Sequence, residues 1–90
     1  MSEKTYTPGE VIEKVGKGLN RDNLAYFVRE GYIAPKKAKR GNQVYKQYTE
    51  ANLWIIDRAM TYMDRFKTRP RAAFEMAKKD YGKGELGLDI

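Results

Sequence analysis

The chain has 90 residues, with 18 lysines and arginines against 12 acidic residues and a formal net charge of +6. It contains no cysteine and no histidine, which excludes disulfides and cysteine-based metal sites and removes the commonest general base. No apolar run approaches the roughly 20 residues that cross a bilayer, and the N-terminus has no signal-peptide core. We therefore expect one small soluble domain in the cytoplasm.

Residues 7–15 carry the signals of a short helix. Thr7 fits the N-cap position, Pro8 the first helical position, and Glu10 the return half of a capping box. Gly16 is expected to end the helix. The Gly-Lys-Gly sequence at residues 16–18 predicts a turn. A nucleotide-binding loop is not expected there, because the glycines lack the longer spacing of such a loop.

A second short helix is predicted between Asn20 and Gly31. Asn20 is its expected N-cap, and Leu24, Phe27 and Val28 recur at the spacing of one buried helical face. The Tyr-Ile pair after Gly31 is expected to pack against the core. The proline two residues later blocks any further helix.

A small basic β-hairpin is predicted next. Gly41-Asn42 is a turn signal between two short segments, residues 34–40 and 43–48. Residues 34–49 contain five cations and no acid, whereas the rest of the chain is close to neutral. The five cations are Lys36, Lys37, Lys39, Arg40 and Lys46. Such a segment favours a polyanionic partner, usually nucleic acid and less often a membrane, although a solvated charged loop is the simpler interpretation.

Two further helices are predicted. Thr49 is the expected N-cap of the third, and Pro70 marks the start of the fourth. The expected core face of the third helix is Leu53, Ile56, Met60, Met63 and Phe66, with Trp54 also in the core. The fourth helix is expected to run through Ala72, Ala73, Met76 and Ala77 and to cover the third, with Phe74 and Met76 as its only large apolar residues. Residues 81–90 contain three glycines and are expected to form a flexible tail, which leaves residues 1–80 as the domain.

The order helix, turn, helix, hairpin, helix, helix predicts a mainly α fold of the winged helix-turn-helix class. In this fold the first two helices form the helix-turn-helix, and the basic hairpin beside them forms the wing. Two more helices complete the core.

With this register, the segment from Tyr6 to about Met76 resembles the DNA-binding domain of the MerR family of prokaryotic transcription regulators. The family's first helix opens on Y-T-x-G-E-V, matched here by Tyr6, Thr7, Gly9, Glu10 and Val11. Its second helix is matched by Gly18, Leu19, Asn20, Asn23, Leu24, Tyr26, Phe27, Gly31, Tyr32, Ile33 and Pro35. Its wing is matched by Gly41, Tyr45, Thr49 and Leu53.

The sequence departs from the family pattern at several points. Ala25, Val28 and Gln43 replace the family's arginine, glutamate and wing arginine, and the first turn is two residues longer. The family's long dimerising helix and effector domain have no counterpart in these residues. Metal or drug sensing of the family's usual kind is therefore not supported.

The resemblance implies that the second helix enters the major groove of double-stranded DNA and that the wing holds flanking phosphates or the adjacent minor groove. Asn20, Arg21 and Asn23 would reach base edges, and Tyr26 and Arg29 would contact the backbone. The expected wing contacts are Lys36, Lys37, Lys39, Arg40, Tyr45 and Lys46.

Simpler roles are open for several of these residues. Asn20 is a good N-cap without DNA, and Tyr26 is equally suited to packing against the wing. Asp22 complements the helix dipole and would repel phosphate. The cations around the third and fourth helices, Arg65, Lys67, Arg69 and Arg71, fit a solvated helix junction.

Three functions compete at this point. The first is a DNA-binding transcription regulator in the nucleoid. The second is an architectural or recombination accessory protein of the excisionase type, and the third is a protein-interaction adaptor on the same fold. An enzyme is not expected, and neither is a cofactor or a metal. We expect a monomer in free solution that pairs side by side on DNA or through a partner protein.

Overall fold

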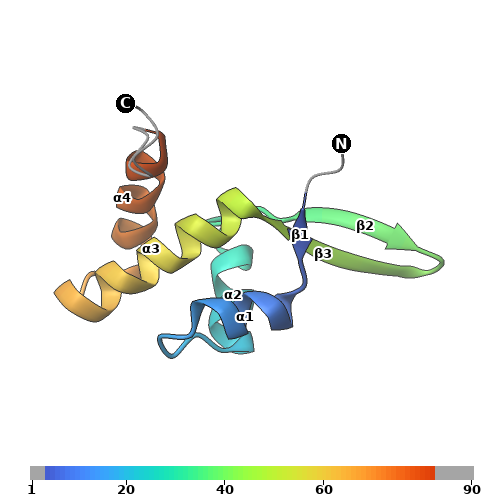
Figure 1. Cartoon of the computed structure of the whole chain (residues 1–90), viewed down its shortest axis with the longest axis horizontal. Helices are drawn as coiled ribbons and strands as arrows, with labels where there is room; N and C mark the ends of the chain where they lie inside the picture. The colour runs from blue at the N-terminus through green and yellow to red at the C-terminus, as the bar shows by residue number, and fades with distance from the viewer. Residues whose placement is uncertain (1–3, 83–90) are drawn as a thin grey trace.

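Four helices and a small antiparallel sheet make up the part of the chain that the computed structural model describes, residues 4–82 (Figure 1). The helices are α1 (Pro8–Val15), α2 (Arg21–Arg29), α3 (Glu50–Phe66) and α4 (Pro70–Gly82). The strands are β1 (Thr5–Tyr6), β2 (Lys36–Arg40) and β3 (Gln43–Thr49), in the spatial order β1-β3-β2. The mainly helical class and the hairpin between α2 and α3 are confirmed.

The three predicted helix starts are confirmed by their hydrogen bonds. The Thr7 hydroxyl accepts from the Glu10 amide at 3.2 Å, and the Glu10 carboxylate accepts from the Thr7 amide at 2.8 Å. Thr49 and Asn52 form the same reciprocal pair at the start of α3, at 3.1 and 3.0 Å. Asn20 caps α2 by accepting from the Asn23 amide at 2.8 Å. Local side chains therefore define each start.

The turn between α1 and α2 uses backbone conformations that glycine favours. Gly16, Lys17 and Gly18 have φ values of 63°, 53° and 80°. Lys17 is the one residue of the three with a side chain, and its ammonium lies 2.6 Å from the Asp57 carboxylate on α3. The turn is thus tied to the third helix. The prediction of a turn at these residues is confirmed.

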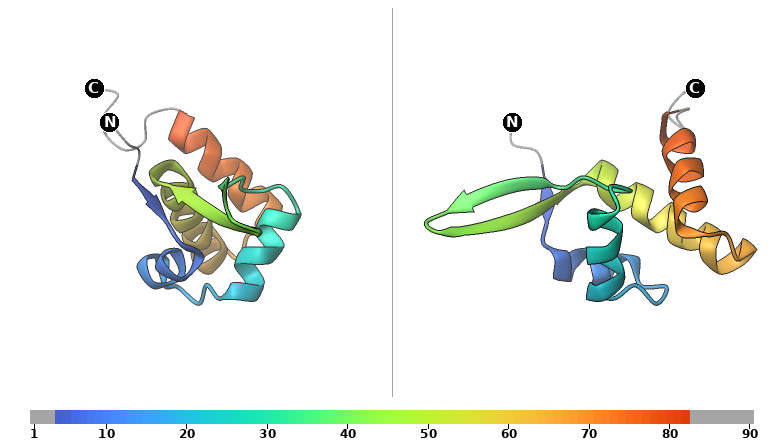
Figure 2. Two further views of the ribbon diagram at one scale, coloured as in Figure 1. Left: turned by 90° about the vertical axis from the view of Figure 1, so that its right-hand side faces the viewer. Right: turned by 180° about the vertical axis from the view of Figure 1, so that it is seen from behind.

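The sheet contains a strand that the sequence patterns do not predict. β1 pairs with the end of β3, placing Thr5 opposite Thr49 and Tyr6 opposite Tyr48. Both tyrosines are buried. Their pairing fixes the root of the hairpin to the start of α1, while the rest of the hairpin extends away from the helices (Figure 2).

The hairpin turn is the one expected from its sequence. Arg40 pairs with Gln43, so Gly41 and Asn42 alone form the connection. Gly41 has a φ of 62°. A glycine with positive φ at the first central position is typical of a type II′ turn, which matches the twist of the flanking strands.

The core face of α3 differs in part from the predicted one. Its buried residues are Ile55, Ile56, Ala59 and Met60, and the partly buried Leu53, Trp54 and Met63 pack against the core. Phe66 is 66% exposed, so its assignment to the core is wrong. It is the last residue of α3, and its ring lies 6.0 Å from that of Tyr62 on the same helix.

The buried face of α4 contains only part of its apolar residues. Ala73 and Ala77 are buried, but Ala72 and Met76 are exposed. Phe74 takes the core position, because its ring packs 4.8 Å from Phe27 and stacks on Tyr32 at 5.6 Å between centroids. The larger aromatic ring therefore sets the rotation of the helix.

A polar cluster joins the end of α4 to α3. The Arg58 guanidinium lies 3.1 Å from the Asp80 carboxylate, which also accepts a hydrogen bond from the Tyr62 hydroxyl. The hydrogen bond to Asp80 raises the pKa of Tyr62, and hydrogen bonds with Tyr62 and Asp80 raise the pKa of Arg58. The helix runs to Gly82, past the boundary expected at residue 80. Residues 83–90 of the predicted tail lie outside the described residues.

Candidate nucleic-acid interface

The hairpin register divides the predicted wing residues between two faces. Directly opposed residues of an antiparallel pair point to the same face, and successive residues alternate. Lys37 opposes Lys46, and Lys39 opposes Val44, two positions along each strand. These four residues form one surface, which we call the Lys37 face.

The opposite surface carries the remaining wing residues. We call it the Arg40 face, and its members are Lys36, Ala38, Arg40, Gln43, Tyr45 and Gln47. The Tyr45 hydroxyl donates to the Gln43 side chain at 2.5 Å, in keeping with two residues on one side of a strand. The register thus adds a detail to the predicted basic wing: three of its five cations lie on one face and two on the other.

The Lys37 face leads toward the N-terminus of α2. Tyr48, two residues after Lys46 on the same face, is buried in the core. A hollow of about 220 Å³ is lined by Pro8, Arg21, Leu24, Ala25, Lys46 and Tyr48. Lys46 of the hairpin and Arg21 of α2 thus border one concave surface. The structure brings these two predicted site residues together, although they are far apart in sequence.

Arg21 also lies close to the start of α1. Its guanidinium Nη2 is 3.6 Å from the position that a Cβ on Gly9 would occupy. This separation is an ordinary van der Waals distance, so the arginine lies directly beside the first turn of α1. Three elements therefore meet around this cation: the start of α1, the start of α2 and β3.

Asn23 and Tyr26 lie on another side of α2. With Lys17, Phe27, Met60, Met63, Asp64, Lys67 and Pro70 they line a separate hollow of about 330 Å³. The Arg29 guanidinium lies 5.6 Å from the centre of the Tyr26 ring. Burial and a hydrogen bond with Tyr26 raise the pKa of Tyr32. Tyr26 is thus partly engaged in packing, but against Phe27 and Tyr32, whereas the simpler interpretation expects packing against the wing.

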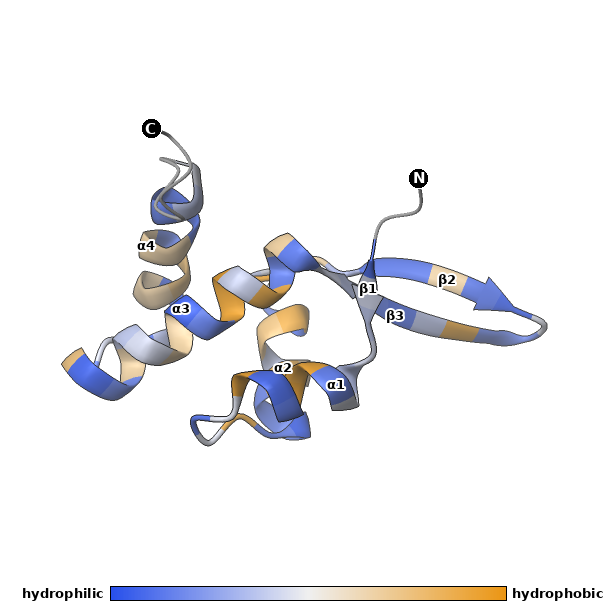
Figure 3. Cartoon of the chain, viewed as in Figure 1, coloured by the Kyte–Doolittle hydropathy of each residue, from blue (hydrophilic) through white to orange (hydrophobic). Residues whose placement is uncertain are grey.

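The exposed surface of α2 is not strongly basic. Its exposed residues include Arg21, Asp22, Asn23, Ala25 and Arg29, with Glu30 directly after the helix. Asp22 lies in the first turn, where an acid complements the helix dipole but opposes phosphate. The positive charge of the candidate interface therefore comes mainly from the hairpin, which Figure 3 shows as a largely hydrophilic projection.

Val44 is a residue of this surface that no sequence pattern singles out. It is 60% exposed and lies on the Lys37 face, opposite Lys39 and two residues from Lys46. Strand alternation, counted from the Gly41-Asn42 turn, is the signal that places it there. It is therefore an apolar side chain on a cationic surface.

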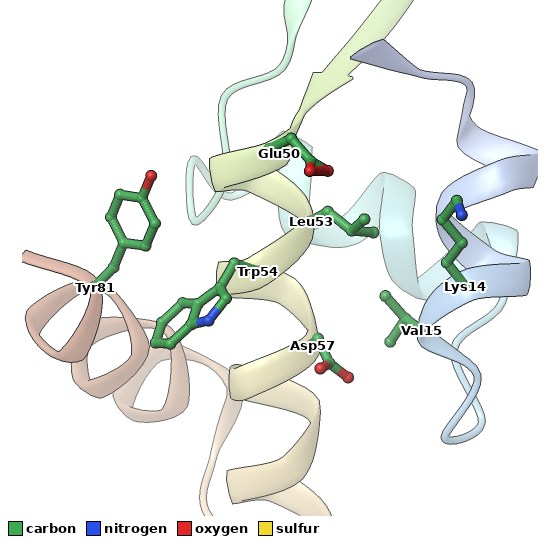
Figure 4. Close-up of a pocket in the computed structure, with 7 residues that line it drawn as sticks. All are labelled: Lys14, Val15, Glu50, Leu53, Trp54, Asp57 and Tyr81. Carbon is green, nitrogen blue, oxygen red and sulfur yellow. The ribbon is translucent and has the colours of Figure 1, made fainter. Parts of the chain in front are cut away.

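A further hollow, of about 370 Å³, lies between α1, α3 and α4 (Figure 4). It is lined by Lys14, Val15, Glu50, Leu53, Trp54, Asp57 and Tyr81. Both of its carboxylates have partners in the fold. Glu50 accepts from the Tyr6 hydroxyl at 2.5 Å, and Asp57 pairs with Lys17. Because each carboxylate is bonded to a side chain of the fold, the two carboxylates have a structural role here.

Residues 4–82 contain no group of three or more acidic, histidine or cysteine residues placed to hold a metal ion. Within that range, no helix is both long and apolar enough to cross a membrane.

No protein-family model matches the sequence, and comparison with curated proteins and with solved structures returns no match either. The function must therefore be inferred from the residues of the chain itself.

The two roles of Asn20 can be separated by substitution. We expect Asn20→Ala to lower the free energy of unfolding by about 1 kcal/mol, because it removes the N-cap acceptor of α2. Asn20→Asp keeps that acceptor and should remain close to the parent in stability. Urea unfolding followed by Trp54 fluorescence measures both. Unchanged stability in Asn20→Ala would contradict the capping role.

Proposed function

We propose that the chain binds double-stranded DNA with a winged helix-turn-helix arrangement. In this arrangement α1 and α2 form the helix-turn-helix, and the β2–β3 hairpin forms the wing. One observation carries the proposal: Lys46 on the Lys37 face and Arg21 at the N-terminus of α2 border the same concave surface. A cationic strand face and a helix N-terminus both favour phosphate, and here they adjoin.

In the proposed complex, the N-terminus of α2 approaches the major groove and the Lys37 face holds flanking phosphates. Arg21 is the side chain there with base-reading chemistry, since arginine pairs with guanine. Asn23 lies on another side of α2 and is not part of this contact.

The biological role that fits the resemblance to the MerR family is transcription regulation. A second candidate, the architectural or recombination accessory role, is favoured by the exposed surface of α2. With Asp22, Ala25 and Glu30 exposed, the surface of α2 offers little base recognition. The cations of the hairpin can contact the phosphates of any DNA sequence. The two roles differ in how strongly binding to a preferred site exceeds binding to random DNA.

Salt dependence provides the test of DNA binding. If Arg21 and the three lysines of the Lys37 face each neutralise one phosphate, the logarithm of the binding constant should fall with the logarithm of salt concentration at a slope of roughly −4. Fluorescence anisotropy with a labelled duplex at several salt concentrations measures this slope. Absence of binding at low salt would refute the proposal.

The same titration on random and genomically selected duplexes distinguishes the two roles. A regulator should bind its site at least about 1,000-fold more tightly than random DNA. For an architectural protein, the ratio of the two affinities should be much smaller, and the salt slope should be similar.

A further inference from the structure

A hollow of about 390 Å³ lies where the Arg40 face of the hairpin meets β1. The residues that line it on this side of the sheet are Thr5, Thr7, Ala38, Arg40, Tyr45 and Gln47. Thr5 opposes Thr49, which is two residues after Gln47 on β3, so Thr5 extends the Arg40 face across the sheet. The hollow therefore lies mainly on the face opposite to the proposed duplex contact.

Tyr45 is the exposed aromatic residue of this hollow. It is 47% exposed, and the residue opposite it on β2 is Ala38, whose side chain is a single methyl group. The hydroxyl of Tyr45 donates to the Gln43 side chain at 2.5 Å, which restrains the ring. A restrained ring loses little conformational freedom when a planar group stacks on it.

The lining of the hollow is positively charged. Its cations are Lys39, Arg40 and Lys46. Among the lining residues within the described range, 4–82, none is acidic. Two acids in the neighbourhood, Glu10 and Glu50, bond to the Thr7 amide and the Tyr6 hydroxyl and do not line the hollow. The hollow therefore favours an anionic ligand.

We propose that this hollow binds a nucleotide of a single-stranded nucleic acid, with the base stacked on Tyr45. Cations hold the phosphates of such a strand, and an exposed aromatic ring stacks on its bases. The strand must be unpaired, because a base in a duplex is already stacked on its neighbours. An acidic peptide would match the charge but would leave the tyrosine ring without a stacking partner. The site adds to the proposed duplex contact and does not depend on it.

The test measures fluorescence anisotropy with labelled uridylate strands of about eight nucleotides, one with deoxyribose and one with ribose, and with a base-free DNA strand of equal charge. The parent chain should bind the tighter uridylate strand on the order of tenfold better than the base-free strand, because stacking adds to phosphate binding. Tyr45→Ala should remove this difference. Tyr45→Phe keeps the ring and should retain it.

Two variants on the Lys37 face provide matched controls. Val44→Thr changes the neighbouring exposed residue and keeps a β-branched side chain, so it should leave binding of the uridylate strand unchanged. Arg40→Ala should flatten the salt slope for this strand by about 0.7 units. Lys37→Ala removes an equal charge from a residue that does not line the hollow and should leave that slope unchanged.

Equal binding of the uridylate and base-free strands by the parent would overturn the stacking site, as would unchanged binding by Tyr45→Ala. Displacement of the uridylate strand by an acidic peptide of equal length and charge, as effectively as by unlabelled strand, would also overturn it. A parent that binds a duplex but no single strand overturns this inference alone. A parent that binds the uridylate strand through Tyr45 but no duplex overturns only the proposed function.

Discussion

Replacing Lys37 and Lys46 with alanine is expected to weaken binding to duplex DNA on the order of 50-fold near 0.1 M salt and to flatten the salt slope by about 2 units. The two lysines oppose each other on the Lys37 face. Each is expected to release about one counterion from a phosphate on binding, and the loss of two such contacts sets the size of the effect. The loss should be similar for all DNA sequences, because phosphate contacts carry no sequence information.

The hairpin supplies its own control of equal charge. Lys36→Ala with Arg40→Ala removes two cations from the Arg40 face of the same strands. This double variant has the same net charge as the first, so general attraction between protein and DNA changes equally. We expect the Arg40-face double variant to retain most of the parent chain's salt slope. Equal losses in the two double variants would contradict an interface confined to the Lys37 face.

Phe74→Ala is expected to lower the free energy of unfolding by about 3–5 kcal/mol, a large fraction of the 5–15 kcal/mol of a typical domain. Phe74 is 1% exposed and packs against Phe27 of α2 and against Tyr32. Its truncation leaves a cavity between α2 and α4 in a core too small to refill it. Urea unfolding followed by fluorescence reports the change, since Trp54 is the only tryptophan and its ring lies 5.4 Å from Tyr81 of α4.

Phe66→Ala is the matched control for this prediction. The same group of atoms is removed, but from a side chain that is 66% exposed. Its effect should stay within about 0.5 kcal/mol, as for most surface substitutions. If Phe66→Ala lowered the free energy of unfolding as much as Phe74→Ala, this would show that Phe66 is covered in solution.

The features that could be predicted from the sequence are those with local causes. Thr7, Asn20 and Thr49 mark the helix starts because an N-cap bonds to an amide three residues away. The hairpin follows from two turn residues, Gly41 and Asn42. In each case the signal and the structure lie within a few residues of each other.

The features that were missed depend on distant parts of the chain. β1 is only two residues long and exists because Tyr6 meets Tyr48. Helical spacing groups Phe66 with the core residues of α3, but spacing does not reveal where the neighbouring helices end. Likewise, Phe74 rather than Met76 faces inward because Phe27 and Tyr32 are there to receive its ring.

The candidate site likewise combines features with local causes and features that depend on distant parts of the chain. The basic segment is evident from composition, and its separation into two faces follows once the register is known. The approach of Lys46 to Arg21 could not be predicted, because it depends on how the hairpin root packs on α1 and α3. The separation of Asn23 and Tyr26 from Arg21 follows from helical periodicity, since residues two and five positions apart do not share a helix face.

The Lys37 face and the N-terminus of α2 are proposed to form one DNA interface. An NMR titration tests this most directly: a short duplex is added to the ¹⁵N-labelled chain, and the amide chemical shifts are followed. The account predicts that the largest shift changes occur at Lys37, Lys39, Lys46 and Arg21. Residues of the α1–α3–α4 hollow, such as Trp54, should change little. Changes confined to that hollow or to α4, or no changes at low salt, would contradict it.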